Sequence, residues 1–240
     1  MERREVSEKN GGFFRRFMFN SAVLHNIYRF IINIVYPNIC PCCNKIIDYD
    51  EDFCHECKES IVIYDGEYKI DYADEYVSYC YYKGKVRNAI RRFKYEPCGN
   101  SYYAFAFNIV QALYLRELAE EIDMVVYIPM TRRDERRRGY NQTRLIAKEI
   151  HYLLNIPCVN VLVKNRTTKN QKSLNKTDRK SNLDGAFSIR NKKYSFDDKC
   201  ILIIDDVCTT GSTLSEAAKI LKAAGAQKVI AATFAKTKRE

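Results

Sequence analysis

The segment ILIIDDVCTTGSTL (residues 201–214) carries the strongest signal in this chain of 240 residues. Branched aliphatic residues lead directly to Asp205 and Asp206, and small hydroxylated residues around Gly211 follow. The apolar run predicts a buried strand, and the residue pattern over 213–224 predicts a helix after it. Ligands of open parallel sheets bind beyond the carboxyl ends of the strands. We therefore expect a ligand site where this strand ends.

The loop after the two acids has the chemistry of a phosphate site. Backbone N–H groups and the dipole of the following helix favour a dianionic phosphate, and the Thr and Ser hydroxyls add donors. The carboxylates of Asp205 and Asp206 do not suit that phosphate. They suit neutral hydroxyls, such as a ribose diol, or a divalent cation. A sugar 5-phosphate satisfies both halves of the site.

The same segment has alternative interpretations. An apolar strand that ends in acids resembles a Walker B element, but the chain contains no G-x-x-x-x-G-K-[ST] sequence to accompany it. It contains no G-x-G-x-x-G sequence either, so a nicotinamide site has no support. Thr213 and Glu216 fit an ordinary capping box, which would not explain the paired acids. We interpret Cys208 as a passive thiol in the wall of the loop and not as a nucleophile.

Strand and helix patterns alternate from about residue 76 onward. This alternation implies an α/β fold with a parallel sheet covered by helices on both faces. The expected strands are 76–82, 123–130, 159–163, 186–190, 200–206 and 228–235. The expected helices are 85–95, 101–121, 141–154 and 213–224, with Asn141 as the N-cap of the third.

The segment CPCCNKIIDYDEDFCHEC (40–57) contains two C-x-x-C pairs. Their spacing predicts a tetrahedral zinc site of four thiolates, closed to water and therefore structural. Cys42 and His55 lie within the pairs and are alternative ligands, and Asn44 suits the left-handed turn of such a site. Most other cysteines lie in apolar runs, which favours a reducing cytosol over a disulfide framework. The expected ligands are Cys40, Cys43, Cys54 and Cys57.

The net charge of +10 indicates polyanionic partners, namely nucleic acid, phosphorylated metabolites or acidic lipid. Five arginines lie within RRDERRRGYNQ (132–142), which we interpret as a basic loop at the carboxyl end of a strand, beside the ligand site. Arginine binds pyrophosphate and nucleic-acid phosphates alike. The alternative is a basic loop that contacts only solvent. Residues 164–180 hold seven Lys or Arg against one Asp and lack apolar periodicity, as expected of a lid or a link.

The N-terminal residues 13–36 are apolar but interrupted, so they predict neither a transmembrane span nor a signal peptide. Their apolar residues recur at helical spacing and predict one amphipathic helix. We favour a helix docked on its own protein over an anchor at a membrane surface. The apolar positions are Phe13, Phe17, Leu24, Ile27, Ile31 and Ile34.

IIDDVCTTGSTL closely resembles the phosphoribosyl-pyrophosphate (PRPP) motif of the type I phosphoribosyltransferases. The resemblance implies that Asp205 and Asp206 meet the ribose hydroxyls and serve catalysis. It places the 5-phosphate in the loop formed by Thr209, Thr210, Gly211, Ser212 and Thr213.

The order of motifs resembles the ComF family of bacterial competence-associated proteins. A zinc knuckle is followed by R-R-G-Y-N-Q, T-x-x-Q-x-x-L, N-x-x-G-A-F and the PRPP loop, and Y-x-G and K-Y elements also match; the resemblance covers about residues 36–235. It implies a helical leader (1–36), a zinc ribbon (37–65) and a phosphoribosyltransferase-like domain (76–240). It also implies a cytoplasmic protein, with peripheral membrane association as the alternative.

The resemblance implies two functions. One is a magnesium-dependent phosphoribosyltransferase serving DNA uptake, with Thr131, Arg132 and Arg133 on the pyrophosphate and Arg166 and Lys172 as lid cations. The other is a non-catalytic module that senses PRPP or binds single-stranded DNA beside a helicase-like partner. The DNA contacts would come from Arg136, Arg137 and Arg138, interleaved with the aromatic residues Tyr81, Tyr82, Phe93 and Tyr95.

Overall fold

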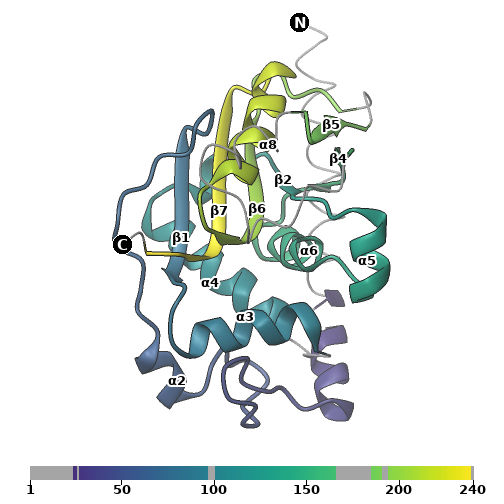
Figure 1. Ribbon diagram of the computed structural model, residues 1–240. Helices are drawn as coiled ribbons and strands as arrows, with labels where there is room; N and C mark the ends of the chain where they lie inside the picture. The colour runs from purple at the N-terminus through teal and green to yellow at the C-terminus, as the bar shows by residue number, and fades with distance from the viewer. Residues whose placement is uncertain (1–23, 26, 97–100, 166–184, 191–193, 239–240) are drawn as a thin grey trace, which may run out of the picture.

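The computed structural model describes residues 24–25, 27–96, 101–165, 185–190 and 194–238. Its centre is a five-stranded sheet in which neighbouring strands run parallel, in the order β1-β7-β6-β2-β3 (Figure 1). This arrangement confirms the predicted parallel α/β sheet. The strands are β1 (Glu75–Tyr81), β2 (Met124–Tyr127), β3 (Cys158–Val159), β6 (Cys200–Cys208) and β7 (Lys228–Lys236).

Helices cover both faces of this sheet and enclose two apolar cores. Residues of β6 alternate between them: Leu202 and Ile204 belong to one core, and Ile201 and Ile203 to the other. A strand buried on both faces needs no polar alternation, which explains its continuous aliphatic run. The first core holds α3 (Lys85–Tyr95), α4 (Ser101–Leu115) and α6 (Gln142–Leu154), and the second holds α8 (Ser212–Ala223).

The direction in which the sheet grows reverses between β2 and β6. From β2 the chain passes through α6 to β3, and from β6 it passes through α8 to β7 on the opposite side. Ligands of parallel sheets bind outside the carboxyl ends of the strands at such a reversal. Asp205 and Asp206 lie in the carboxyl-terminal part of β6 and therefore at this point.

The expected strand 159–163 is divided between two sheets, which corrects the prediction. Its first residue, Val159, belongs to β3, and its last two belong to β4 (Leu162–Lys164). β4 pairs antiparallel with β5 (Phe187–Ile189) in a separate two-stranded sheet. A single apolar run does not reveal where a chain leaves one sheet and enters another.

Two other segments also differ from the expected elements. The expected helix 101–121 ends at Leu115; Glu117 takes a left-handed conformation, and the 3-10 helix η1 (Ala119–Glu121) follows. The arginine-rich segment is a helix, α5 (Arg132–Arg138), and not a loop. Thr131 caps its first turn, and Gly139 ends it with a φ of 85°. Arginine is a good helix former, so two capping residues suffice for a helix of this length.

The cysteine segment packs against the α/β unit through a buried seam. Phe53 is 2% exposed, and its ring lies 6.1 Å from that of Phe234 in β7. Asp52 is also buried, where it accepts hydrogen bonds from Asn108 Nδ2 in α4 at 2.8 Å and from Lys58 Nζ at 2.9 Å. Because an unpaired buried carboxylate is costly, these two donors help to fix the cysteine segment on α4. The helix of this segment is α2 (His55–Ser60).

Residues 27–35 form a helix that packs on its own protein, as expected, but through its polar side. Its contacts centre on Glu149 in α6, which is 2% exposed. His25 Nε2 lies 2.9 Å and Arg29 Nη1 3.9 Å from the carboxylate oxygens of Glu149. The Arg29 guanidinium also lies 3.2 Å from the ring centre of Tyr103. A buried carboxylate requires such partners, so polar contacts orient this helix.

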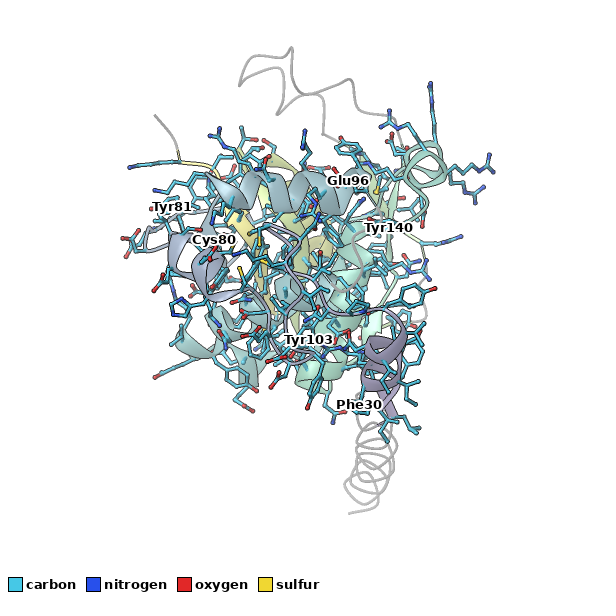
Figure 2. All side chains as sticks on the ribbon, turned by 90° about the horizontal axis from the view of Figure 1, so that it is seen from below. Phe30, Cys80, Tyr81, Glu96, Tyr103 and Tyr140 are labelled. Carbon is cyan, nitrogen blue, oxygen red and sulfur yellow. The ribbon has the colours of Figure 1, made fainter. Side chains whose placement is uncertain are left out.

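The apolar residues of this helix face outward. Phe30 lies toward the edge of the molecule in Figure 2, and Ile27 and Ile34 are 50% and 71% exposed. Phe13 and Phe17, also predicted for the apolar face, lie outside the described residues. Across the part of the chain that the structure describes, no helix combines the length and apolar character required to cross a membrane.

Candidate functional site

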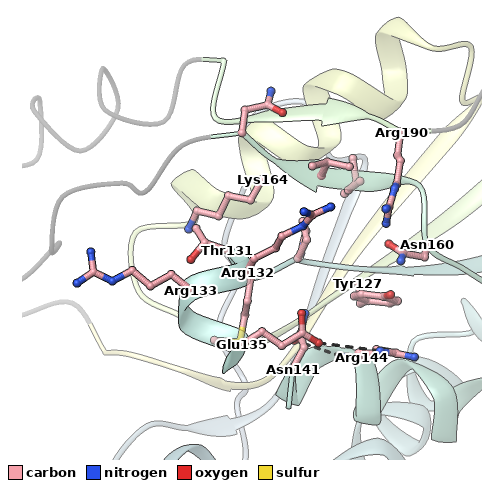
Figure 3. A pocket seen from close by; sticks show the side chains of 15 residues that line it. Tyr127, Thr131, Arg132, Arg133, Glu135, Asn141, Arg144, Asn160, Lys164 and Arg190 are labelled. Carbon is pink, nitrogen blue, oxygen red and sulfur yellow. Dashed lines mark hydrogen bonds and ion pairs between the residues drawn. The ribbon is translucent and has the colours of Figure 1, made fainter. Parts of the chain in front are cut away.

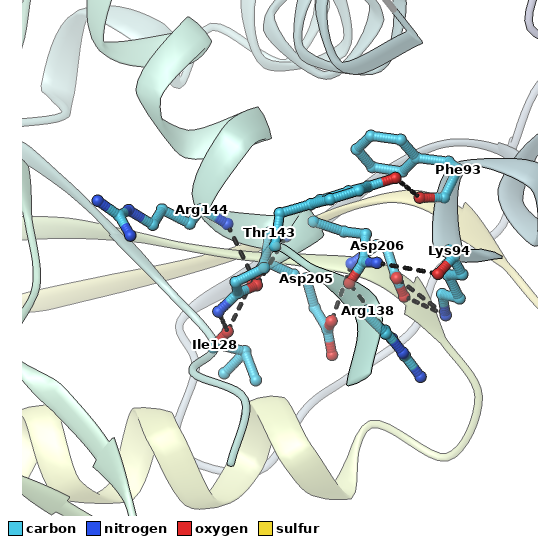
Figure 4. Close-up of polar contacts among 11 residues, drawn as sticks. Phe93, Lys94, Ile128, Arg138, Thr143, Arg144, Asp205 and Asp206 are labelled. Atoms are coloured by element: carbon cyan, nitrogen blue, oxygen red, sulfur yellow. Dashed lines mark hydrogen bonds and ion pairs between the residues drawn. The ribbon is translucent and has the colours of Figure 1, made fainter. Parts of the chain in front are cut away.

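Asp205 and Asp206 lie side by side near the carboxyl end of β6. Asp206 is 8% exposed, and Lys94 Nζ from α3 lies 2.9 Å from its Oδ1 and 2.8 Å from its Oδ2 (Figure 4). The Asp206 N–H donates to Asp205 Oδ1 at 2.8 Å. One carboxylate is therefore held by a lysine, while the other remains for a ligand.

The electrostatics of the pair follow from its burial. Burial, followed by repulsion from Asp206, raises the pKa of Asp205 to about 7, and Lys94 and Lys164 oppose this rise. Burial alone would lower the pKa of Lys94, but the contact with Asp206 outweighs it and the pKa is raised. Near neutral pH, Asp205 is therefore only partly ionised.

Three cations from three different elements surround the acids. Lys94 comes from α3, Arg138 from α5 and Lys164 from β4. Arg138 lowers the pKa of both lysines through its charge, which places it close to them, and Figure 4 shows it beside the acids. Arg138 Nε is buried and has no hydrogen-bond partner among the described residues. This N–H group is therefore available to an anionic ligand.

The loop after the acids leads into a helix N-terminus that no side chain caps. Gly211 is the N-cap residue, with a φ of 76°, and α8 begins at Ser212. The alternative interpretation of Thr213 and Glu216 as a capping box is therefore not supported, and Glu216 Oε1 instead accepts from the Gly185 N–H at 2.9 Å. The first N–H groups of α8 have no partner within the helix and remain free for an anion.

Two side chains hold the carbonyl groups of this loop. Lys236 Nζ donates to the Thr209 carbonyl at 2.9 Å, and the Tyr68 hydroxyl donates to the Thr210 carbonyl at 2.8 Å. Because the N–H and C=O of a trans peptide point in opposite directions, the N–H groups of Thr210 and Gly211 point away from these partners. A Cβ on Gly211 would lie 3.3 Å from the Tyr68 ring, so close packing also requires glycine here.

The hydroxyl groups of the loop lie together at the helix start. Thr210 Oγ1 and Ser212 Oγ are 2.9 Å apart, and Thr209 is exposed. Cys208 is 2% exposed in the second core, which agrees with a passive thiol and not with a nucleophile.

The second half of the R-R-G-Y-N-Q motif forms a scaffold for Lys94. The Tyr140 hydroxyl donates to the Phe93 carbonyl at 2.6 Å, and Gln142 Nε2 donates to the Lys94 carbonyl at 3.3 Å. Asn141 Oδ1 accepts from the backbone N–H groups of α6 and caps that helix, as predicted. The motif therefore joins α3, which carries Lys94, to α5 and α6.

The expected pyrophosphate residues lie at the start of α5. Thr131 is largely committed to capping, because its Oγ1 accepts from the Asp134 N–H at 3.1 Å and donates to Asp134 Oδ2 at 2.8 Å. Arg132 and Arg133 line a cavity of about 750 Å³ together with Lys164 (Figure 3). Lys164 also interacts with Asp205, so this cavity lies next to the acidic pair.

The arginines expected to bind nucleic acid do not form one group. Arg136 and Arg137 are exposed on α5, whereas Arg138 is only partly exposed and belongs to the acidic site. Phe93, expected as a stacking ring, is 1% exposed and belongs to the core, which corrects that expectation. The expected lid cations Arg166 and Lys172 lie outside the described residues.

The four expected cysteine ligands form one cluster. Their Sγ atoms all lie within 4.8 Å of one another, and those of Cys43 and Cys54 are 3.6 Å apart. A tetrahedral zinc with Zn–S bonds of about 2.3 Å separates its sulfurs by about 3.8 Å, so the cluster fits this ion. Asn44 takes the predicted left-handed conformation, with a φ of 66°, and its N–H donates to the Cys40 carbonyl at 2.9 Å.

Neighbouring groups distinguish the ligands from the alternatives. The thiol of Cys42 is not one of the four clustered sulfurs, and a hydrogen bond from it lowers the pKa of Cys40 to about 4. His55 is exposed and lies 3.7 Å from Glu59 instead. Four thiolates around Zn²⁺ would leave excess negative charge, and Lys85 Nζ lies 3.5 Å from Cys57 Sγ, where it can offset that charge.

Sequence reasoning gave no role to Lys94, Lys164, Tyr68 or Lys236. Lys94 follows the last buried residue of α3, and Lys236 ends the apolar strand β7. Both lysines could have been found from the sequence. A lysine beside the buried face of a helix, or at the end of a buried strand, indicates a partner for acids when a neighbouring strand ends in acids. Tyr68 lies in an irregular connection and gave no such signal.

Two known domain families match this chain, one over the part that contains the acidic site and one over the part that contains the cysteine cluster. Residues 142–240 match the phosphoribosyl transferase domain family. Residues 31–68 match the double zinc ribbon domain family, which agrees with a structural zinc ion in the cysteine cluster.

Three curated relatives are similar to this chain. Competence protein F of Haemophilus influenzae is 36% identical over 108 residues, which are 45% of this chain and 47% of that protein. DNA utilization protein YhgH of Escherichia coli strain K12 is 34% identical over 45% of this chain and 46% of that protein. Competence protein ComFC of Bacillus subtilis strain 168 is 28% identical over 58% of this chain and 55% of that protein. The chain thus spans about half the length of the curated relatives it matches.

Replacing one ligand of the cysteine cluster should remove its metal. We expect Cys57→Ser to lower the zinc content from about one ion per chain to nearly none and to lower the melting temperature, because the metal holds the ribbon together. The Cys42→Ser variant should retain its zinc, because Cys42 is buried but is not a ligand. Elemental analysis of the purified variants measures both, and an equal loss of zinc would contradict the ligand assignment.

The raised pKa of Asp205 predicts how stability depends on pH. The folded protein retains a proton on this group up to about pH 7, whereas the unfolded chain releases it near its ordinary, lower pKa. The contribution of Asp205 to the free energy of unfolding should therefore be largest at low pH and decrease as pH rises to about 7. Asp205→Asn should stabilise the protein more at pH 8 than at pH 4.5, as measured by urea denaturation. The exposed control Asp198→Asn should show no such trend, and a pH-independent effect of Asp205→Asn would contradict the raised pKa.

Proposed function

We propose that this chain, which belongs to the ComF family, binds PRPP together with Mg²⁺ at the carboxyl end of β6. The 5-phosphate would lie at the N-terminus of α8, within residues 209–213, and the ribose hydroxyls would donate to Asp205 and Asp206. One observation carries the proposal. A single strand–loop–helix unit presents an uncapped helix N-terminus beside two carboxylates, and neither a simple anion nor a simple cation matches both.

The pyrophosphate group would extend from the ribose toward α5. Lys164 and Arg138 supply positive charge next to the acids. Thr131, Arg132 and Arg133 lie at the start of α5, where they would contact the pyrophosphate. Mg²⁺ prefers oxygen ligands and keeps part of its water shell, so one or two carboxylates of the acidic pair suit it in combination with ligand oxygens. When bound, the ion would supply charge neutralisation for the leaving pyrophosphate.

The corresponding activity is transfer of phosphoribose to an acceptor. The bond between ribose C1 and the pyrophosphate oxygen breaks, a bond between C1 and the acceptor nucleophile forms, and pyrophosphate leaves with the electron pair. The chain would contribute position and charge, since the acids hold the ribose and the cations receive the leaving group. A sensor that binds PRPP without transfer would use the same contacts, and the release of pyrophosphate distinguishes the two.

Two of the relatives are named for competence and for DNA utilization. We propose that the chain acts in natural competence in the cytoplasm, beside a helicase-like partner. A second function, binding of single-stranded DNA, is favoured by Arg136 and Arg137, which are exposed, and by the exposed ring of Tyr95. Such a surface would combine phosphate contacts with base stacking.

Binding of PRPP should require both the metal and the acids. Isothermal titration should show binding with Mg²⁺ and at least tenfold weaker binding without it. Asp205→Asn combined with Asp206→Asn should weaken binding at least a hundredfold, because the variant loses both carboxylate charges, which strengthen the hydrogen bonds from the ribose hydroxyls and attract Mg²⁺. Asp197→Asn combined with Asp198→Asn makes the same chemical change at exposed positions and should bind normally. Equal affinity in the two double variants would refute the proposed site.

Binding of single-stranded DNA should depend on other residues. Arg136→Gln combined with Arg137→Gln should weaken binding of an oligonucleotide and reduce the slope of log affinity against log salt by roughly one to two, because each arginine neutralises about one phosphate. The Asp205 and Asp206 double variant should retain the binding. Fluorescence anisotropy at several salt concentrations measures both, and an unchanged slope would exclude this surface.

A further inference from the structure

A basic cavity lies beside the acidic site, bounded by α5, α6 and β4 (Figure 3). Its volume of about 750 Å³ is within the range of small-molecule sites. Five cationic side chains and one carboxylate, Glu135, line it. The cations are Arg132, Arg133, Arg144, Lys164 and Arg190.

Most of this charge is not compensated by the protein. Within the described residues, no carboxylate pairs with Arg132 or Arg190, and Arg144 Nη1 lies 4.0 Å from Glu135 Oε1, a long ion pair. Several cations that converge on one concave surface raise the local concentration of anions. Their mutual repulsion has a cost that a bound anion would remove.

The cavity has two ends. Lys164 and Thr131 lie at one end, and Lys164 interacts with Asp205, so this end continues into the acidic site. Arg190 and Asn160 lie at the other end, beside Tyr127 (Figure 3). Burial raises the pKa of Tyr127, and the charges of Arg144 and Arg190 oppose this rise; Figure 3 shows both arginines at the end of the cavity where Tyr127 lies.

We propose that this far end binds a phosphate group of a second ligand, a nucleotide. An inorganic anion would fill only a small part of the cavity, whereas Pro129, Met130, Leu162 and Val163 add apolar surface suited to a ring. Arg144 and Arg190 would hold the phosphate, and the amide of Asn160 would contact the sugar or base. The inference rests on the proposed function only for the near end, where the pyrophosphate of PRPP would lie.

Isothermal titration with ADP and GDP tests this site. At least one of them should bind at least tenfold more tightly than adenosine or guanosine. Arg144→Gln combined with Arg190→Gln should weaken that nucleotide at least tenfold, because two charge-assisted hydrogen bonds are lost. The affinity for PRPP should change less than threefold. Arg190→Gln alone, at an exposed residue without a carboxylate partner, should show a smaller loss and guards against misfolding.

Matched variants separate this site from the proposed PRPP site. Arg91→Gln combined with Arg116→Gln removes the same charge from exposed positions outside the cavity and should bind the nucleotide normally. The Asp205 and Asp206 double variant should lose PRPP but retain the nucleotide. If PRPP does not bind and the nucleotide does, the proposed function fails and this inference stands.

Three results would overturn the inference. They are equal affinity for nucleotide and nucleoside, an unaffected Arg144 and Arg190 variant, and loss of nucleotide binding when PRPP saturates the protein. A protein that binds only oligonucleotides and no mononucleotide would overturn it as well.

Discussion

Two carboxylates at the end of one buried strand are the constraint on which the rest of the site depends. Asp205 and Asp206 cannot both be charged in a desolvated position without cations nearby. Lys94 meets this need directly, and Arg138 and Lys164 add charge from two other elements. α3, α5 and β4 are therefore positioned by the electrostatic demand of a single strand end as well as by apolar packing.

A second set of contacts connects the zinc-ribbon part of the chain to the phosphate loop. The irregular connection after α2 carries Tyr68 and Ile70, which pack against Gly211. Tyr68 also holds the Thr210 carbonyl, and Lys236 lies 4.1 Å from the Tyr68 ring centre. The cation, the ring and the loop thus form one connected group. The conformation of the phosphate loop consequently depends on a segment that precedes the whole sheet, and not only on its own sequence.

The features of the fold that depend on local sequence could be predicted. The parallel sheet, the strand before the acids, the N-cap Asn141 and the left-handed Asn44 all follow from periodicity or from one residue's conformational preference. The division of 159–163 between two sheets and the partners of Lys94 depend on contacts distant in the chain, which no local pattern contains. The N-terminal helix is an instructive case, because its apolar periodicity predicted a helix but not which face contacts the protein. The buried Glu149 determines that orientation.

The arginines of α5 show why charge composition alone does not identify a ligand. A loop would place the five arginines of residues 132–138 in one flexible group, whereas a helix distributes them at about 100° per residue. Arg132 consequently faces the cavity, Arg137 pairs with Asp134 on the exposed side, and Arg138 faces the acidic pair. One basic segment thus serves separate surfaces. The helix is possible because Thr131 caps its start and Gly139 ends it, so two uncharged residues determine how the charge is divided.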